Sequence, residues 1–246
     1  MHCALCISLA DPAVWDHGTH FSDEEHIALD LGGKTREVES WFQGQWNGQA
    51  LSVTNGTLVF TKGVNVHGGM VNVAPDATLR LARGSNLGTG LGDAGTRVFN
   101  VAPGGKLDMD GIGWNMDHTR VLIPKGATWN ADFSRLSLLG AMKDNLWDIG
   151  GKALFPRGIK VAQADWGCAL KIVLREGGEM LVGGPVSSIG VRRCGFELVL
   201  EGGTVTLFWD AKFEPGLVRV APGATVNVRV AKGTSFSRRA RRGTPT

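Results

Sequence analysis

Three aspartates near the middle of the chain are the residues best placed to do chemistry. Asp108 and Asp110 lie in the segment LDMD, and Asp132 closes the segment WNAD. Apolar and polar residues alternate in both segments, as in a strand with one buried face, so the aspartates belong to the other face. Neighbouring carboxylates can serve as general acid and base, because like charges raise one pKa, or they can hold Ca²⁺. These three are the candidate catalytic residues.

The spacing of these residues suits two copies of one repeated unit. If the units stack, we expect Asp132 to lie over Asp110 and Asn130 over Asp108, with Arg80 in the matching position one unit earlier. An alternative interpretation is a solvated surface on which Arg80 pairs with Asp108, since surface ion pairs are common and contribute little stability.

A second polar cluster lies near the start of the chain, in WDHGTHFSDEEH (residues 15–26). His17 and His20, together with Asp110 and Asp132 elsewhere, are the candidate metal ligands. The spacing differs from HExxH, which argues against a zinc protease. The alternative is a polar cap on the first unit. We expect no cofactor other than Ca²⁺.

Two cysteines have equivalent positions in the pattern. Cys168 and Cys194 each precede an alternating apolar run by two residues, so both should point inward one repeat apart. That separation is within the range of a disulfide, but we favour two buried thiols, because free cysteine is among the most buried residue types. Cys3 and Cys6 form one CxxC without a second, which does not make a zinc site.

A short block beginning with Gly, Asn or Asp recurs along the chain between runs of alternating apolar residues. Its starts are 21, 28, 22, 32, 19, 25 and 21 residues apart, a mean of 24. The blocks are NGTL at Asn55, DATL at Asp76, GGKL at Gly104, GATW at Gly126, GIKV at Gly158, GGEM at Gly177, GGTV at Gly202 and GATV at Gly223. A period of this size indicates a solenoid.

Each unit therefore consists of a strand, a corner and another strand. Helical spacing of apolar residues is missing from the repeats, although Asp23–Leu31 and Asp144–Gly151 could each hold a short helix. We predict an all-β, single-domain, parallel right-handed β-helix of about eight coils of roughly 24 residues. Its expected parts are an N-terminal tail and cap (1–30), the solenoid (31–236) and a basic disordered tail (237–246).

Composition narrows the classes of function. The 246 residues carry a net charge of +3, which is too balanced to indicate nucleic-acid binding. The sequence contains no apolar run of the length that a membrane span needs. The first residues lack the basic region of a typical signal peptide, so they do not indicate where the protein is located.

Four segments carry a family resemblance: VNVAPDATLRL (71–81), FNVAPGGKLDM (99–109), LVLEGGTVTL (198–207) and VRVAPGATVNV (218–228). Together they resemble the right-handed, pectin-lyase-like β-helix superfamily, most of all the repeats of autotransporter passengers and bacterial surface β-solenoids. The chain lacks the membrane strands of an autotransporter, so it could be a fragment, a partner-exported protein or an unrelated protein of the same fold.

The resemblance implies a non-enzymatic structural and adhesive module, secreted or on a bacterial surface. Its partners would be glycans or a cell-surface receptor, bound through lateral faces and the variable segments Asn86–Arg97, Arg135–Gly151 and Gly183–Arg193. End-to-end contact with neighbours is left open. The alternative is a polysaccharide lyase or glycoside hydrolase that uses Asp108, Asp110 and Asp132, because the superfamily contains both classes and fold alone does not give activity.

Overall fold

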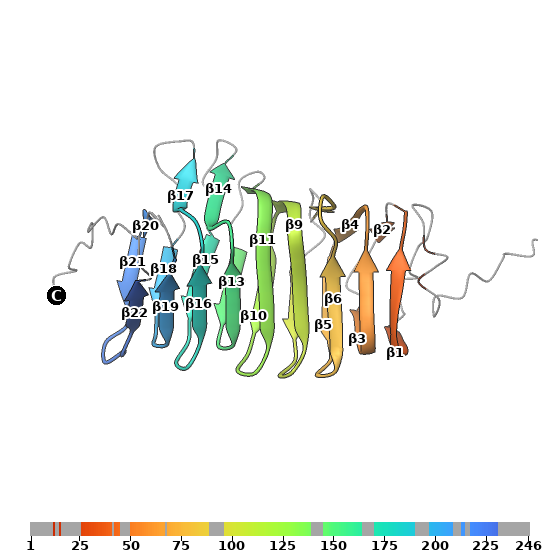
Figure 1. Cartoon of the computed structure of the whole chain (residues 1–246), viewed down its shortest axis with the longest axis horizontal. Coiled ribbons are helices and arrows are strands. Elements are labelled where there is room, and N and C mark those ends of the chain that lie inside the picture. The colour runs from red at the N-terminus through yellow and green to blue at the C-terminus, as the bar shows by residue number, and fades with distance from the viewer. Residues whose placement is uncertain are drawn as a thin grey trace, which may run out of the picture.

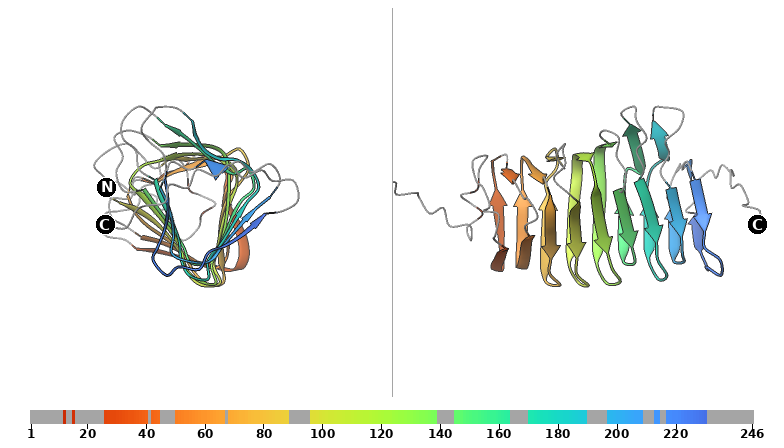
Figure 2. Two further views of the ribbon diagram at one scale, coloured as in Figure 1. Left: turned by 90° about the vertical axis from the view of Figure 1, so that its left-hand side faces the viewer. Right: turned by 180° about the vertical axis from the view of Figure 1, so that it is seen from behind.

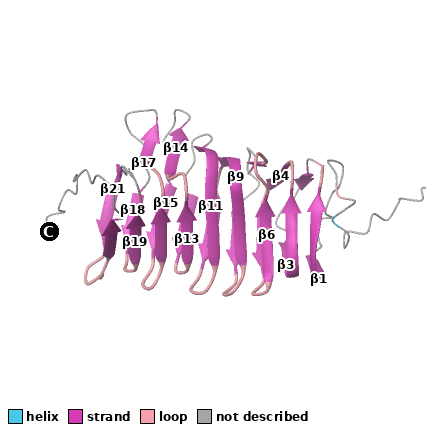
Figure 3. Cartoon of the chain, in the orientation of Figure 1, coloured by secondary structure: helices cyan, strands magenta, loops and turns pink. Residues whose placement is uncertain are grey.

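The computed structural model shows a single stack of parallel coils (Figures 1 and 2). It describes residues 12, 15, 26–40, 42–44, 50–66, 68–88, 96–138, 145–163, 170–189, 197–208, 213–214 and 217–230. Every regular element in these residues is a β-strand, drawn magenta in Figure 3. The predicted fold class is confirmed, and the number of coils differs slightly from the prediction.

Three walls of strands surround the interior. The first wall contains the first halves of β1 (Ile27–Val38) and β3 (Ala50–Phe60), then β5 (Gly69–Val73), β8 (Arg97–Val101), β10 (Thr119–Ile123), β12 (Asn145–Ile149), β15 (Leu170–Leu174), β18 (Glu197–Leu200) and β21 (Leu217–Val220). The second contains the remainder of β1 and β3, then β6 (Ala77–Leu81), the first part of β9 (Lys106–Met116) and of β11 (Thr128–Leu138), β13 (Lys152–Phe155), β16 (Glu179–Val182), β19 (Thr204–Leu207) and β22 (Asn227–Val230).

The third wall is shorter and less regular. It contains β2 (Phe42–Gly44), β4 (Gly63–Val66), β7 (Asn86–Gly88), the ends of β9 and β11, β14 (Ile159–Gln163), β17 (Val186–Ile189) and β20 (Phe213–Glu214). The chain returns from this wall to the first one through connections of very different length. Only two residues, 117–118, join β9 to β10, whereas β7 and β8 are separated by residues 89–96.

In-register pairing turns the alternating residues into inward rows. On the first wall Val53 pairs with Val73, and Val73 with Val101, and all three are at most 2% exposed. On the second wall Leu58, Leu79 and Leu107 form an equivalent row. The predicted phase of the strands is therefore confirmed. The rows exclude water from the interior as far as β18 and β19, and this burial is the main source of stability in such a repeat fold.

Aromatic residues fill the middle of the stack. Trp129 contacts Trp147 edge to face with ring centroids 5.0 Å apart, and Trp114 stacks on Trp147 at 6.1 Å. Ala131 and Ala153 are fully buried beside these rings and leave room for them. Trp114 and Trp147 are 1% and 0% exposed, so both belong to the core.

The corners between the first and second walls explain the recurring glycine. At the corner of residues 102–105, Gly105 N donates to Ala102 O at 2.8 Å, and Gly104 has φ +91°. A turn with positive φ at its third residue favours glycine there. The next glycine of a Gly-Gly corner has a second constraint, because a Cβ on Gly151 would lie 2.4 Å from the carbonyl oxygen of Ala127 in the preceding coil.

Some local predictions were wrong. The block at Gly158 opens β14 on the third wall, and the corner of that coil is at Gly150–Gly151 instead. The segments expected to allow short helices contain β1 and β12, because Ile27, Leu29, Trp147 and Ile149 continue the inward rows. The cysteine pair of the sequence analysis, at 168 and 194, lies outside the described residues.

The inward rows can be tested on a single strand. Val101→Asp should lower the free energy of unfolding by on the order of 4 kcal/mol, because it places an unpaired charge in the dry interior. The matched control is Asn100→Asp, which introduces the same charge on the outward face of β8 and should cost only about 1 kcal/mol, for the lost hydrogen bond from Asn100 Nδ2 to Asn72 Oδ1. Chemical denaturation followed by far-UV circular dichroism measures both; equal losses in the two variants would contradict the inward assignment of Val101.

Candidate functional site

A β-bulge brings the three candidate aspartates to one corner of the stack. Between the pairs Met109–Ala131 and Ile112–Phe133, β9 contains two residues, Asp110 and Gly111, whereas β11 contains only Asp132. Gly111 has φ +63°, which fits a bulge position. The bulge lies where the second wall turns into the third, so outward residues of neighbouring coils converge there.

Three arginines contact these carboxylates. Arg80 Nε lies 3.7 Å from Asp108 Oδ2, and its Nη2 lies 3.4 Å from Asp110 Oδ2. Arg83 Nε is 3.9 Å from Asp110 Oδ1. Asp108 also accepts a 2.6 Å hydrogen bond from Asn130 Nδ2, its partner in the strand register. The expected stacking of Asn130 on Asp108 and the expected proximity of Arg80 are both present.

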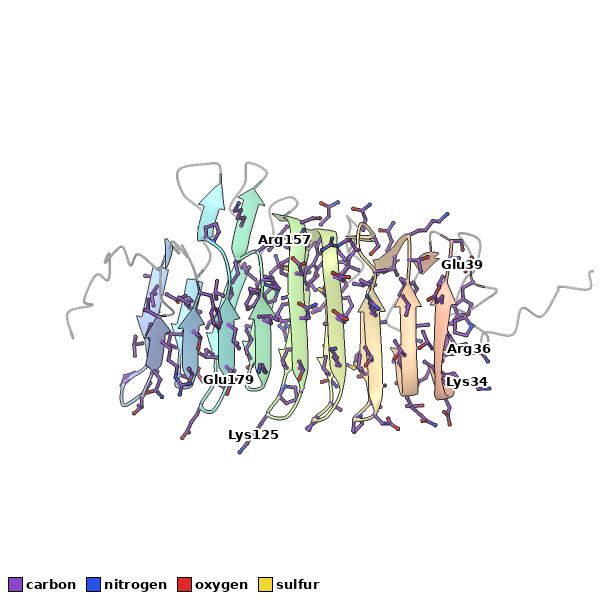
Figure 4. All side chains as sticks on the ribbon, viewed as in Figure 1. Lys34, Arg36, Glu39, Lys125, Arg157 and Glu179 are labelled. Atoms are coloured by element: carbon purple, nitrogen blue, oxygen red, sulfur yellow. The ribbon has the colours of Figure 1, made fainter. Side chains whose placement is uncertain are left out.

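The third arginine comes from the following coil. Arg157, labelled in Figure 4, lies in the corner between β13 and β14, and its Nε is 3.3 Å from Asp132 Oδ1. Its guanidinium group also passes over Gly111, where a Cβ would lie 3.4 Å from Nη2. The missing side chain at Gly111 thus gives Arg157 space beside Asp132. We call Arg80, Arg83, Arg157, Asp108, Asp110 and Asp132 the corner cluster.

Asp132 differs from the other two aspartates in its burial. Its side chain is 10% exposed, whereas those of Asp108 and Asp110 are 17% and 32% exposed. The alternation of residues assigned Asp132 to the outward face; the bulge and Arg157 cover its carboxylate there, which the sequence did not predict. Burial raises the pKa of the Asp132 carboxyl; Arg157 acts in the opposite direction, and the charge of Asp110 adds to the rise.

The metal predictions stay predictions. His17 and His20 lie outside the described residues. Asp110 and Asp132 are close to each other but both contact arginines, which compete with a cation for their oxygens. Within the part of the chain that the structure describes, no three His, Cys, Asp or Glu side chains gather as a metal-ligand group, and no helix is long and apolar enough to cross a membrane.

A second polar cluster lies inside the corner between the third and first walls. The Arg97 side chain is fully buried; its Nε donates to Val66 O and its Nη1 to Asp117 O, each at 3.0 Å. The Asp117 carboxylate is 3% exposed and lies 4.0 Å from Arg97 Nη1, with His118 Nδ1 2.5 Å from its other oxygen. The buried charges of Arg97 and Asp117, which come from neighbouring coils, thus compensate each other.

His118 is the exposed end of this cluster. Its side chain is 43% exposed and its backbone has φ +39°, an uncommon value for a residue with a side chain. The short turn is fixed from both sides, because Thr119 Oγ1 donates to Asp117 O at 2.6 Å and Thr119 N donates to Asn145 Oδ1 at 2.9 Å. This geometry holds one imidazole in a defined orientation at the surface.

Sequence reasoning missed this second cluster. Arg97 ends a segment that was interpreted as a variable loop, and His118 lies in a turn with no repeated motif. The available signal was a phase argument, because Arg97 precedes the inward residues Phe99 and Val101 by steps of two and therefore points inward itself.

Comparison with known proteins adds no relative to this geometry. No protein-family model, no curated protein and no solved structure matches the chain. The functional argument therefore rests on the fold and on the residues themselves.

Burial of Asp132 makes the free energy of unfolding depend on pH, and the raised pKa fixes the direction of that dependence. Because its folded-state pKa is raised, the folded protein holds the proton more tightly, and stability falls as the pH rises from the ordinary carboxyl pKa through the raised one. Asp132→Asn removes this fall. The advantage of the natural protein over the variant should therefore shrink with increasing pH across that window, measured by urea midpoints. Parallel curves for the two proteins would contradict the raised pKa.

The buried ion pair should be important for stability. Asp117→Asn leaves the Arg97 charge without its anion and should cost about 3 kcal/mol of unfolding free energy. His118→Asn is the control, since asparagine tolerates positive φ and the side chain is half-exposed, and it should cost much less. Thermal unfolding of both variants checks this; a stable Asp117→Asn protein would show that the carboxylate is dispensable.

Proposed function

We propose that this protein is a non-catalytic, adhesive β-solenoid module of a bacterial surface or secreted protein. The stacked walls form a rigid support of regular spacing, and the corner cluster supplies a polar contact surface on it. The assignment to an external location is supported by the sequence resemblance to surface β-solenoids. The observation that carries the binding role is the mutual pairing of charges in the corner cluster.

Charge pairing argues for binding over catalysis. Each carboxylate of the corner cluster contacts an arginine, three anions against three cations. A general base needs an available lone pair within reach of the substrate, and here those lone pairs face the protein's own guanidinium groups. Such a cluster is already neutral and well ordered, so it suits recognition of a ligand.

The exposed parts of the cluster indicate the chemistry of that ligand. The side chains of Arg80, Arg83 and Arg157 are 45%, 71% and 44% exposed, so their outer N–H groups face solvent. Guanidinium groups donate paired hydrogen bonds to hydroxyl and carboxylate oxygens. We therefore favour a glycan that carries carboxylate groups, bound at the corner.

A glycan-cleaving enzyme is the second candidate, and one observation favours it. Asp132 has a raised pKa next to Asp110, and such a pair can divide into proton donor and anion. In that case Asp132 would give its proton to the leaving oxygen, while Asp108 or Asp110 would take a proton from the water that attacks the sugar carbon. The pairing of Asp110 with two arginines weakens this assignment.

A panel of acidic and neutral glycans, tested for retention and for cleavage, distinguishes the candidates. Arg83→Gln should weaken retention of acidic glycans about tenfold through loss of a charge-assisted contact. Arg120→Gln is the matched control, because Arg120 is exposed on the first wall away from the corner. Cleavage that disappears in Asp132→Asn and Asp110→Asn would replace the binding role with the enzymatic one.

A further inference from the structure

The C-terminal end of the stack exposes apolar side chains that belong to the interior rows. Val220 pairs with Leu200, Val228 with Val205, and Val230 with Leu207. These three valines are 57%, 50% and 51% exposed, whereas their partners are at most 6% exposed. Within the described residues, β21 and β22 pair with a strand on one side only. The row ends with its apolar face and its backbone edge open.

The N-terminal end is different. Trp15 is 2% exposed, lies against Phe60 with tilted rings whose centroids are 6.5 Å apart, and accepts a 2.7 Å hydrogen bond from Ser40 Oγ on its carbonyl oxygen. Lys34 and Arg36, labelled in Figure 4, are exposed charged residues of the edge strand β1, where Arg36 pairs with Leu58. Charged side chains on an edge strand oppose pairing with another chain. Head-to-tail stacking of two copies would place these charges on the exposed valines.

We propose that the open end binds the same end of a second copy, so that the protein forms a twofold symmetric dimer. A twofold axis through the corner at Pro222–Gly223 places β21 of each copy antiparallel to β22 of the other, which closes both edges at once. Twofold contacts of this kind are self-complementary and do not grow into fibres. This inference does not depend on the proposed glycan binding.

The side chains favour one register of that pairing. With Val218 opposite Val228, Val220 lies opposite Val226, and Arg219 lies opposite Asn227. A shift by two residues would instead oppose Arg219 and Arg229, and like charges directly opposite destabilise a sheet. Arg219 already pairs with Glu197 at 2.5 Å within its own copy. Arg229 of each copy carries an exposed positive charge on the interface strand β22, so added salt should screen the repulsion between the copies and strengthen the dimer.

Sedimentation velocity of the full chain over a wide range of concentration tests the proposal. The natural protein should show a monomer–dimer equilibrium that shifts to dimer with added salt. Val220→Asp and Val228→Asp should each weaken it about a hundredfold, because each inserts a charge into the apolar contact. Both sites are half-exposed in the single chain, so both variants should keep the far-UV spectrum and melting temperature of the natural protein.

Met70→Asp is the matched control, since Met70 is an exposed apolar residue, 38% exposed, on the first wall away from this end. It should leave the dimer intact. A protein that is monomeric at every concentration, a dimer that survives both valine variants, or an oligomer that grows beyond two copies would each overturn the proposal.

Discussion

The register between successive coils is the constraint on which the rest of the structure depends. Side chains alternate with a period of two along a strand, so a slip of one residue would turn a whole inward row toward solvent. Corners hold the register, because positive φ at positions such as Gly104 and the close approach of Gly151 to the preceding coil leave room for few other conformations. Aliphatic rows then supply the energy that makes this register the stable one.

The polar sites arise where this regular pairing is interrupted. The extra residue at Asp110–Gly111 bends β9 at the corner and lets side chains from three coils meet around Asp132. The two-residue turn at Asp117–His118 similarly presents an imidazole that contacts the Asp117 carboxylate, and Arg97 donates from the interior to the carbonyl oxygen of Asp117. A perfectly regular solenoid would present only columns of like side chains. Irregularities in the ladder are thus what give this surface chemical variety.

Sequence alone predicted the features that depend on period and phase. Inward rows such as Val73–Val101, the corner glycines and the proximity of Asn130 to Asp108 all follow from alternation. It failed where a local pattern had two interpretations. Gly158 is flanked by the residues typical of a corner, but it directly precedes β14 on the third wall. The corner of that coil is formed by Gly150–Gly151, which is a weaker match to the repeated block. The burial of Asp132 depends on Arg157 from the next coil, which no local pattern contains.

The aromatic residues at the centre make the contacts between coils larger in the middle of the stack than near its ends. Trp114, Trp129 and Trp147 bind several successive coils through large ring contacts, whereas coils nearer the ends are joined by smaller aliphatic side chains. In a one-dimensional array each unit is stabilised only by its neighbours, so folding can start wherever those contacts are strongest. We therefore expect folding to start in the central coils and unfolding to begin at the two ends.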